Sequence, residues 1–227
     1  MITAIVLAAG NGSRMQSSVK KQYMMLLGKP LVCYSLKAFN DCEDVDRIIV
    51  VTGDEDINYM RDNIVEKFNL NKVTEVVAGG KERYNSVYNG LQYAKTSNYI
   101  LVHDGARPCI TSENISRIIE QVKLHSACVA GVPAKDTIKI IDSNNNIVET
   151  PDRNTLWLAQ TPQAFKSDIL IKAYDEMMRA GDNSVTDDSM VVEKYCSINV
   201  IMVECSYNNI KVTTPEDIAV AERFLLE

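Results

Sequence analysis

A short loop near the start of the chain combines small residues with positive charge. The run Ala8-Ala9-Gly10-Asn11-Gly12-Ser13-Arg14-Met15 follows an apolar stretch, and Lys20 and Lys21 come close behind it. Glycines with small neighbours let backbone N–H groups approach a phosphate, and Arg14 with Lys21 would supply positive charge. The pattern predicts a phosphate-binding loop, and the glycine spacing alone also fits a plain strand-to-helix turn.

This loop differs from two widespread nucleotide-binding motifs. In the dinucleotide pattern G-x-G-x-x-G the third glycine would fall at Met15, and the P-loop pattern G-x-x-x-x-G-K-[ST] occurs nowhere in the chain. A nucleotide site built here must therefore use another kind of loop, with Arg14 and Lys21 as its cations.

The order of predicted strands and helices indicates where this loop lies. Short β-branched runs predict strands at 3–8, 47–52, 73–77, 99–103 and 128–132. Runs of helical period predict helices at 30–39, 55–68, 86–95 and 112–124, with Pro30 in the first helical position. Right-handed crossovers then give an α/β, Rossmann-like fold, a mostly parallel sheet with helices on both faces. Ligands bind outside the carboxyl ends of such strands, where the loop would lie.

The alternation of strands and helices breaks between residues 136 and 160. Two short strand-like runs, 137–141 and 147–149, flank an asparagine-rich turn, which predicts a β-hairpin arm projecting from the α/β body. A hairpin of this size cannot bury its own apolar residues, so we expect it to pack against another copy of the chain. The expectation is one domain over 1–227, with 136–160 as a dimerisation arm inserted in it.

Beyond this arm the pattern returns to alternating elements. It predicts helices at 167–179 and 187–195, a strand at 199–204, and a closing helix at 215–226 capped by Thr214.

Composition and charge exclude several classes of protein. With 46% hydrophobic and 24% charged residues over 227 positions, the chain has a globular composition rather than a disordered one. Its formal net charge of -6 argues against a protein that mainly coats nucleic acid. Its apolar runs fall far short of the ~20 residues that cross a bilayer, and its first residues lack a charged signal region. We therefore expect a cytoplasmic protein with neither nucleic acid nor membrane as a partner.

Six cysteines without a C-x-x-C pair predict small buried thiols rather than a zinc site or a disulfide framework.

Six motifs in order along the chain carry a family resemblance. They are Leu7-Ala8-Ala9-Gly10 leading to Lys21-Gln22-Tyr23, Gly79-Gly80-Lys81-Glu82-Arg83, Val102-His103-Asp104-Gly105-Ala106-Arg107-Pro108, Lys135-Asp136-Thr137-Ile138-Lys139, Thr161-Pro162-Gln163 and Asn209-Ile210-Lys211-Val212-Thr213-Thr214-Pro215-Glu216-Asp217. The first is similar to the loop of the sugar and polyol phosphate nucleotidyltransferases. Together they resemble the 2-C-methyl-D-erythritol 4-phosphate cytidylyltransferase family, from one end of the chain to the other.

The resemblance implies a reaction and a nucleotide site. Members of the family transfer a cytidylyl group from CTP to 2-C-methyl-D-erythritol 4-phosphate, with loss of pyrophosphate, in non-mevalonate isoprenoid precursor synthesis. Arg14 and Lys21 match the pair that stabilises triphosphate charge in the transition state. The other nucleotide-binding positions correspond here to Ala8, Ala9, Gly10, Gly12, Gly80, Lys81, Ser86 and Asp104.

The resemblance also implies a site for methylerythritol phosphate. The matching positions are Asp104, Arg107, Thr137, Arg153, Thr161, Thr186 and Lys211. In the family, the positions of Thr137 and Arg153 lie on an arm that reaches into the other subunit's site. This agrees with the predicted hairpin and implies a homodimer with shared active sites.

Repulsion between a phosphate monoester and a triphosphate is the main obstacle to such a reaction. Four cations that the resemblance assigns to catalysis would offset it: Arg14, Lys21, Arg153 and Lys211. The implied cofactor is Mg²⁺ or another divalent cation, held mainly by phosphate oxygens and water. Asp104 is a candidate ligand of that ion, and a helix cap or an ion pair with Arg107 is the alternative. His103 is expected to pack at a strand end, because the attacking phosphate is already an anion.

The chain departs from the family pattern at three places. Lys20 stands where the family usually has proline, which predicts a looser loop and competition with Lys21 for phosphate. Gly105 replaces the first of two alanines, and Ser189 with Met190 replaces an alanine and a serine. Ser189 and Met190 follow closely in sequence after Thr186, which the resemblance assigns to the methylerythritol phosphate site.

Two other functions compete with this reading. Ribitol-5-phosphate cytidylyltransferases share the loop and the Thr161-Pro162-Gln163 motif, but they tend to carry valine and phenylalanine where this chain has Ala106 and Cys109. A non-catalytic nucleotide-binding module would be expected to lose the loop cations or Lys211, and this chain retains them.

Overall fold

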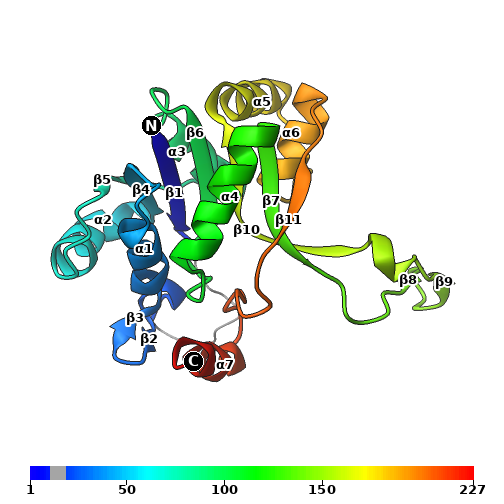
Figure 1. Ribbon diagram of the computed structural model, residues 1–227, viewed down its shortest axis with the longest axis horizontal. Helices are drawn as coiled ribbons and strands as arrows, with labels where there is room; N and C mark the ends of the chain where they lie inside the picture. The colour runs from blue at the N-terminus through cyan, green and yellow to red at the C-terminus, as the bar shows by residue number, and fades with distance from the viewer. Residues whose placement is uncertain (11–18) are drawn as a thin grey trace.

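The computed structural model of the chain describes residues 1–10 and 19–227. These residues form a seven-stranded central sheet in the order β11-β7-β10-β6-β1-β4-β5 (Figure 1). The strands are β1 (Ile2–Ala8), β4 (Arg47–Thr52), β5 (Val73–Ala78), β6 (Tyr99–Asp104), β7 (Ala127–Pro133), β10 (Trp157–Lys166) and β11 (Ile201–Glu204). Strand β10 runs antiparallel to β6 and β7, and the other pairings in this sheet are parallel. The mostly parallel α/β sheet is confirmed.

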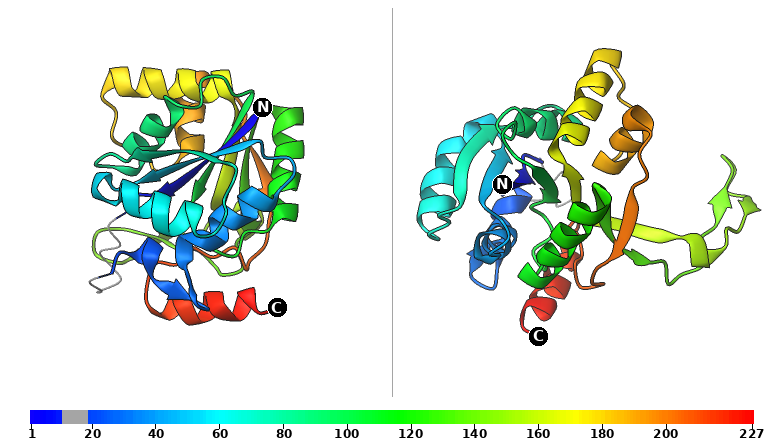
Figure 2. Two further views of the ribbon diagram at one scale, coloured as in Figure 1. Left: turned by 90° about the vertical axis from the view of Figure 1, so that its left-hand side faces the viewer. Right: turned by 45° about the horizontal axis from the view of Figure 1, so that its top comes forward.

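Helices cover both faces of the sheet, because successive residues of a strand point to opposite faces. The helices are α1 (Leu31–Asp41), α2 (Ile57–Met60), α3 (Arg83–Leu91), α4 (Ser112–His125), α5 (Ser167–Ala180) and α6 (Asp188–Cys196). In β1, Ala4 and Val6 join a core cluster with α1, α2 and α4. Ile5 joins the opposite cluster, with α3, α5 and α6. The sheet is therefore buried between two helical layers (Figure 2).

Two expected helix starts are wrong. Pro30 is not the first residue of α1: it ends the short strand β3 (Lys29–Pro30), and its ψ of 138° is extended, so α1 begins at Leu31. Strand β3 pairs with β2 (Met25–Leu26) in a hairpin that the sequence pattern does not predict. Thr214 does not cap the closing helix, α7 (Glu216–Leu225), whose N-cap residue is Pro215 without a side-chain cap.

The predicted helix at 55–68 is present as three consecutive helical segments. A 3-10 turn, η3 (Asp54–Asp56), leads into α2, which continues as the π-helical segment η4 (Arg61–Glu66). The apolar side chains Met60 and Ile64 are fully buried against the sheet. The amphipathic pattern therefore identified the buried face, although it did not distinguish the types of helical turn.

Strand β10 is not predicted by the sequence pattern. Its middle is polar, and it contains Pro162, which cannot donate a backbone hydrogen bond and argues against a central strand. The structure accommodates these residues through a register shift against β7 between Ala159 and Gln163. The buried side chains Gln160, Thr161 and Gln163 all have hydrogen-bond partners. Residues 157–160 of the expected arm thus belong to β10.

The predicted hairpin is present and extends away from the α/β body (Figure 1). Its strands β8 (Ile140–Ile141) and β9 (Ile147–Glu149) pair antiparallel, and the first is shorter than expected. In the turn, Asp142 Oδ1 accepts hydrogen bonds from the backbone N–H groups of Asn144 at 2.8 Å and Asn146 at 2.9 Å. Ile147 remains 63% exposed at the tip, so the arm presents apolar surface that this copy of the chain does not cover.

The described part of the chain contains no helix that is long and apolar enough to cross a membrane. All six cysteines are free thiols, and four of them are buried: Cys33, Cys42, Cys109 and Cys128.

Replacing Asp217 should destabilise the segment that leads into α7. Its Oδ2 accepts hydrogen bonds from Thr213 N at 2.7 Å, Thr213 Oγ1 at 2.8 Å and Thr214 N at 2.9 Å. Asp217→Ala removes this shared acceptor and should lower the free energy of unfolding by about 1–3 kcal/mol at pH 7. Urea denaturation measures the change, with Glu216→Ala on the exposed neighbouring position as the control.

The same variant should show a defined pH dependence. Burial raises the pKa of Asp217, but hydrogen bonds from Thr213 and Thr214 outweigh it and lower the pKa below its ordinary value of 3.8. A carboxylate with a lowered folded-state pKa contributes stability above its unfolded pKa, and this stability is lost as the pH falls through the folded-state pKa. The difference between wild type and Asp217→Ala should therefore shrink below a pH of about 4. A constant difference across this range would contradict the assignment.

Candidate functional site

A cleft of about 580 Å³ opens at the carboxyl ends of the parallel strands. Its walls come from the residues that end β1 and β6 and from the loops that follow β1, β4 and β5. It brings together predicted residues from distant parts of the chain: Ala8, Ala9, Gly10, Lys21, Gly80, Lys81, Ser86, Asp104 and Lys211. Parallel strands place their carboxyl ends at one edge, which is where ligands bind in such sheets.

Two glycines let the start of α3 approach the end of β1. A Cβ atom on Gly79 would lie 2.5 Å from the Cβ of Ala9, and one on Gly80 would lie 2.3 Å from the Cβ of Asn85. Ser86 Oγ accepts a hydrogen bond from the Gly80 N–H at 3.0 Å, which fixes this turn beside the cleft. A larger residue at Gly79 would displace Ala9 at the end of β1, and one at Gly80 would displace Asn85 in the first turn of α3.

A chain of alternating charges runs from α6 into the cleft. The Arg83 guanidinium donates to both oxygens of Asp188, at 3.0 and 2.8 Å, and its Nε donates to Asp104 Oδ1 at 3.2 Å. Lys211 Nζ pairs with the other Asp104 oxygen at 2.7 Å. Asp188 is fully buried and also accepts a 2.5 Å hydrogen bond from the Tyr174 hydroxyl. The chain of contacts holds Lys211 in place through Asp104.

Asp104 is ionised in this arrangement. Burial would raise the pKa of its carboxyl group, but the charges of Arg83 and Lys211 outweigh burial and hold the pKa well below its usual range. The alternative ion pair between Asp104 and Arg107 is not formed among the described residues, and Asp104 pairs with Arg83 and Lys211 instead. The helix-cap alternative is also wrong, because Asp104 ends β6 and the next helix, α4, is capped by Thr111.

Thr161 lies beneath the cleft rather than in its wall. Its hydroxyl accepts a hydrogen bond from the Asp104 backbone N–H at 3.0 Å and contacts His103 Nδ1 at 3.0 Å. Burial lowers the pKa of His103 to about 3, and its ring packs against Phe39 with the ring centroids 5.0 Å apart. His103 is thus neutral and confirmed as a packing residue, and Thr161 fixes the end of β6.

Arg107 supports the loop that carries Lys211. Its Nη1 donates to the Asn209 carbonyl oxygen at 2.8 Å, while its buried Nε has no hydrogen-bond partner in the described chain. Asn209 Nδ2 in turn donates to the Thr161 carbonyl oxygen at 2.9 Å. Through Asn209, these contacts attach the loop of Lys211 both to the segment after β6 and to β10.

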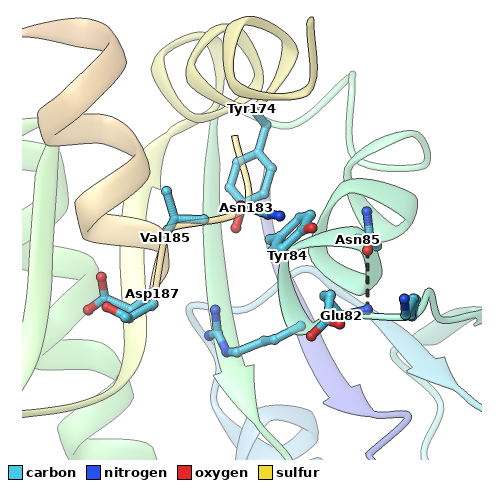
Figure 3. A pocket seen from close by; sticks show the side chains of 10 residues that line it. Glu82, Tyr84, Asn85, Tyr174, Asn183, Val185 and Asp187 are labelled. Atoms are coloured by element: carbon cyan, nitrogen blue, oxygen red, sulfur yellow. Dashed lines mark hydrogen bonds between the residues drawn. The ribbon is translucent and has the colours of Figure 1, made fainter. Parts of the chain in front are cut away.

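A second pocket, of about 380 Å³, adjoins the cleft through the shared residues Lys81, Glu82 and Arg83. It lies between the start of α3, which contributes Tyr84, and the segment that precedes α6, which contributes Asn183 (Figure 3). Thr186 lines this second pocket, and its hydroxyl lies 3.7 Å from Met190 Sδ. Thr186 is therefore beside the main cleft, on the far side of Arg83.

Several predicted residues lie elsewhere. Thr137 and Arg153 are exposed on the arm, and neither lines the cleft of its own chain. Arg153 Nη1 donates to the Lys135 carbonyl oxygen at 3.1 Å, within the arm. Gly12 and Arg14 lie outside the described residues.

The sequence reasoning assigned no role to Arg83, Asp188 or Tyr174. Arg83 stands in a quoted motif, and Asp188 is the second residue of the Asp187-Asp188 pair at the start of a predicted helix. Asp187 caps α6 by accepting from the Met190 N–H at 3.0 Å, as an aspartate at a helix start normally does. The adjacent Asp188 could have been singled out because a second acidic residue there lies on the helix face that packs inward.

The described side chains offer few ligands for a divalent cation. Within the described residues there is no group of three or more His, Cys, Asp or Glu side chains placed to hold a metal ion. Asp104 lines the cleft, but both of its oxygens already accept from cations. Such a site fits Mg²⁺ that would be bound mainly by substrate phosphates and water, with Asp104 as one of several carboxylates that line the cleft.

Comparisons with known proteins identify the family. Residues 2–227 match the model of the family described as IspD, 2-C-methyl-D-erythritol 4-phosphate cytidylyltransferase. The enzyme of that name from Lachnospira eligens is 49% identical over 226 residues, covering 99% of both chains. The one from Lachnoclostridium phytofermentans is 50% identical over 226 residues, covering 100% of this chain and 97% of that one. The crystal structure of 4-diphosphocytidyl-2C-methyl-D-erythritol synthase from Anaerococcus prevotii has a TM-score of 0.87 at 32% identity, covering 100% of this chain and 96% of that one. The chain therefore belongs to the 2-C-methyl-D-erythritol 4-phosphate cytidylyltransferase family of nucleotidyltransferases.

Proposed function

We propose that this protein transfers a cytidylyl group from CTP to 2-C-methyl-D-erythritol 4-phosphate and releases pyrophosphate, in isoprenoid precursor synthesis. The observation that carries the proposal is the cleft itself. A glycine-lined wall, Lys21 and the Asp104–Lys211 ion pair meet there from four separate parts of the chain. Small backbone-rich walls with cations at their rim suit a substrate that carries several phosphates.

The nucleotide side of the site is the wall made by the end of β1 and the start of α3. Ala8, Ala9 and Gly10 offer backbone next to Gly80 and Ser86. Lys81 lies at the rim, where the cleft meets the second pocket. Lys21 and Arg14 act on the triphosphate, where negative charge moves toward the departing pyrophosphate.

The acceptor side is the wall that contains Asp104 and Lys211. Lys211 holds the phosphate of methylerythritol phosphate, while Arg107 and Thr161 position the loop and strand beneath it. Thr186 contributes from the second pocket. Thr137 and Arg153 belong to the site of a second copy, which their arm reaches in a homodimer.

The reaction needs no covalent bond to the protein. A phosphate oxygen of methylerythritol phosphate attacks the α-phosphorus of CTP in line, forming one P–O bond while the bond to pyrophosphate breaks. Positioning and charge neutralisation therefore supply the rate enhancement. Mg²⁺ or another divalent cation bound to the phosphates supplies further charge neutralisation. The free cysteines suit a reducing compartment, and we place the enzyme in the cytoplasm.

The substrate assignment predicts a defined specificity. Pyrophosphate release should be fast with CTP and methylerythritol phosphate, and kcat/KM should fall roughly tenfold or more with UTP or with ribitol 5-phosphate. A coupled pyrophosphate assay measures each pair, with each nucleotide alone as the control for hydrolysis. Equal rates with UTP and CTP would refute the nucleotide assignment, and a preference for ribitol 5-phosphate would favour the related cytidylyltransferase.

The two lysines of the cleft should act at opposite ends of the reaction. Lys21→Ala removes charge that acts mainly in the transition state, so kcat should fall by a factor of about 10² to 10³. Lys211→Ala should also raise KM for methylerythritol phosphate while leaving CTP affinity nearly intact. Steady-state kinetics and calorimetric titration with CTP and magnesium measure both, and thermal midpoints identify any unfolding. Loss of CTP binding in Lys211→Ala, with normal turnover in Lys21→Ala, would reverse the assignment.

Shared active sites predict complementation between inactive chains. Arg153→Ala and Lys21→Ala each damage a different half of the site. Mixed dimers would contain one site with both residues intact, so part of the activity should return. The measurement is turnover of tagged, purified heterodimers, with each variant homodimer as the control. Heterodimers that stay inactive would mean that each site is built from one chain.

A further inference from the structure

The segment that carries Lys21 is attached to the loop after β4 on both sides of that lysine. Lys21 opens the 3-10 turn η2 (Lys21–Tyr23). On one side, Lys20 Nζ pairs with Asp56 Oδ2 at 2.7 Å and with Glu55 Oε1. Both acidic residues belong to the turn η3 and the start of α2. The ammonium group of Lys20 is therefore paired with two carboxylates of the turn η3.

The second attachment uses the aromatic ring two residues after Lys21. The Tyr23 hydroxyl hydrogen-bonds to Thr52 Oγ1, at the end of β4, at 3.1 Å. Its ring meets Tyr59 of α2 edge-on, with 4.8 Å between the ring centroids. Lys21 is thus flanked by two contacts to the same corner of the fold, one ionic and one mostly apolar.

The backbone at Lys20 has the conformation of a proline. Its φ is −60° and its ψ is 137°, and proline restricts φ to about −65°. A lysine can also adopt this extended conformation, but it has no ring that restricts the backbone to it. The two ion pairs are the contacts that this side chain makes, and they remove the freedom that a lysine would otherwise add to the segment.

We propose that Lys20 is a positioning residue for catalysis, whose ion pairs with Glu55 and Asp56 hold the backbone that places Lys21 in the cleft. The proposal rests on the proposed cytidylyl transfer. It replaces the expectation that Lys20 competes with Lys21 for phosphate, because its ammonium group is bound to two carboxylates. Those carboxylates also raise the pKa of Lys20, so it stays charged.

The pairing has a second effect on the cleft. Asp54 and Glu55 line it next to Lys21 and Gly10. Their charges would repel a triphosphate, and the ammonium group of Lys20 offsets part of this repulsion. The acidic turn is therefore compatible with a phosphate site because Lys20 is bound to it.

Variants on both sides of the ion pair test the proposal. Lys20→Met removes the charge and keeps the length of the side chain, and Lys20→Arg keeps the charge. Glu55→Gln with Asp56→Asn removes the acidic partners and leaves Lys20 in place. Lys20→Pro restores the backbone angle without the ion pairs. The matched control is Lys37→Met, since Lys37 forms an exposed ion pair with Asp41 on α1, 2.8 Å long, outside the cleft.

We expect Lys20→Met and the double acidic variant each to lower kcat roughly tenfold, a loss typical of a displaced catalytic group. Calorimetric CTP affinity should fall by less than kcat. Lys20→Arg and the Lys37→Met control should keep the wild-type kcat. The kcat of Lys20→Pro should be higher than that of Lys20→Met.

Three results would overturn the proposal. An unchanged kcat in Lys20→Met would show that the ion pairs do not position Lys21. A loss in Lys20→Met with no loss in the acidic variant would show that Lys20 acts on phosphate directly. Lys20→Pro no better than Lys20→Met would show that the backbone angle is not what the ion pairs provide. A wild-type chain that releases no pyrophosphate would instead refute the proposed function, and CTP titration would still compare the variants.

Discussion

The buried carboxylate of Asp188 sets the arrangement on which the site depends. A charge removed from water is costly unless it is paired, so Asp188 requires the Arg83 guanidinium and the Tyr174 hydroxyl that surround it. Arg83 then pairs with Asp104, and Asp104 with Lys211. Each charged group in this series is therefore fixed in position by its ion pair with the next one. The packing of α6 against the sheet thus determines where the amine of Lys211 lies.

The other half of the site depends on close approach rather than on charge. Gly79 has no side chain, so it can lie against Ala9 at the end of β1, and Gly80 can likewise lie against Asn85 in the first turn of α3. These glycines line the cleft, while Lys20 and Tyr23 attach the segment of Lys21 to the turn after β4 and to the end of β4. The cleft thus combines a cluster of paired charges with closely packed backbone. This suits a reaction in which two phosphate groups must be held in line despite their repulsion.

In the proposed homodimer, the arm of one chain would complete the cleft of the other. Arg153 and Thr137 lie on a hairpin whose tip exposes Ile141 and Ile147. Apolar side chains on a projecting two-stranded hairpin gain stability only against another surface. A second copy of the chain would cover these side chains, and its cleft would receive Arg153. Docking of the arm would therefore both stabilise the proposed dimer and supply a residue for the proposed reaction.

The sequence by itself determined most of the alternation of strands and helices, and the hairpin, because these follow from periodicity and from turn residues that act locally. It also determined the family, through motifs in fixed order. Only the tertiary structure decided that β10 is a central strand, because its polar side chains donate hydrogen bonds to groups distant in sequence, the Ser206 carbonyl oxygen and the Asp187 carboxylate. The same holds for Asp104, whose partners Arg83 and Lys211 come from segments far away along the chain. The sequence alone also could not identify the partners of Lys20, because Glu55 and Asp56 become its neighbours only after β4 pairs with β1.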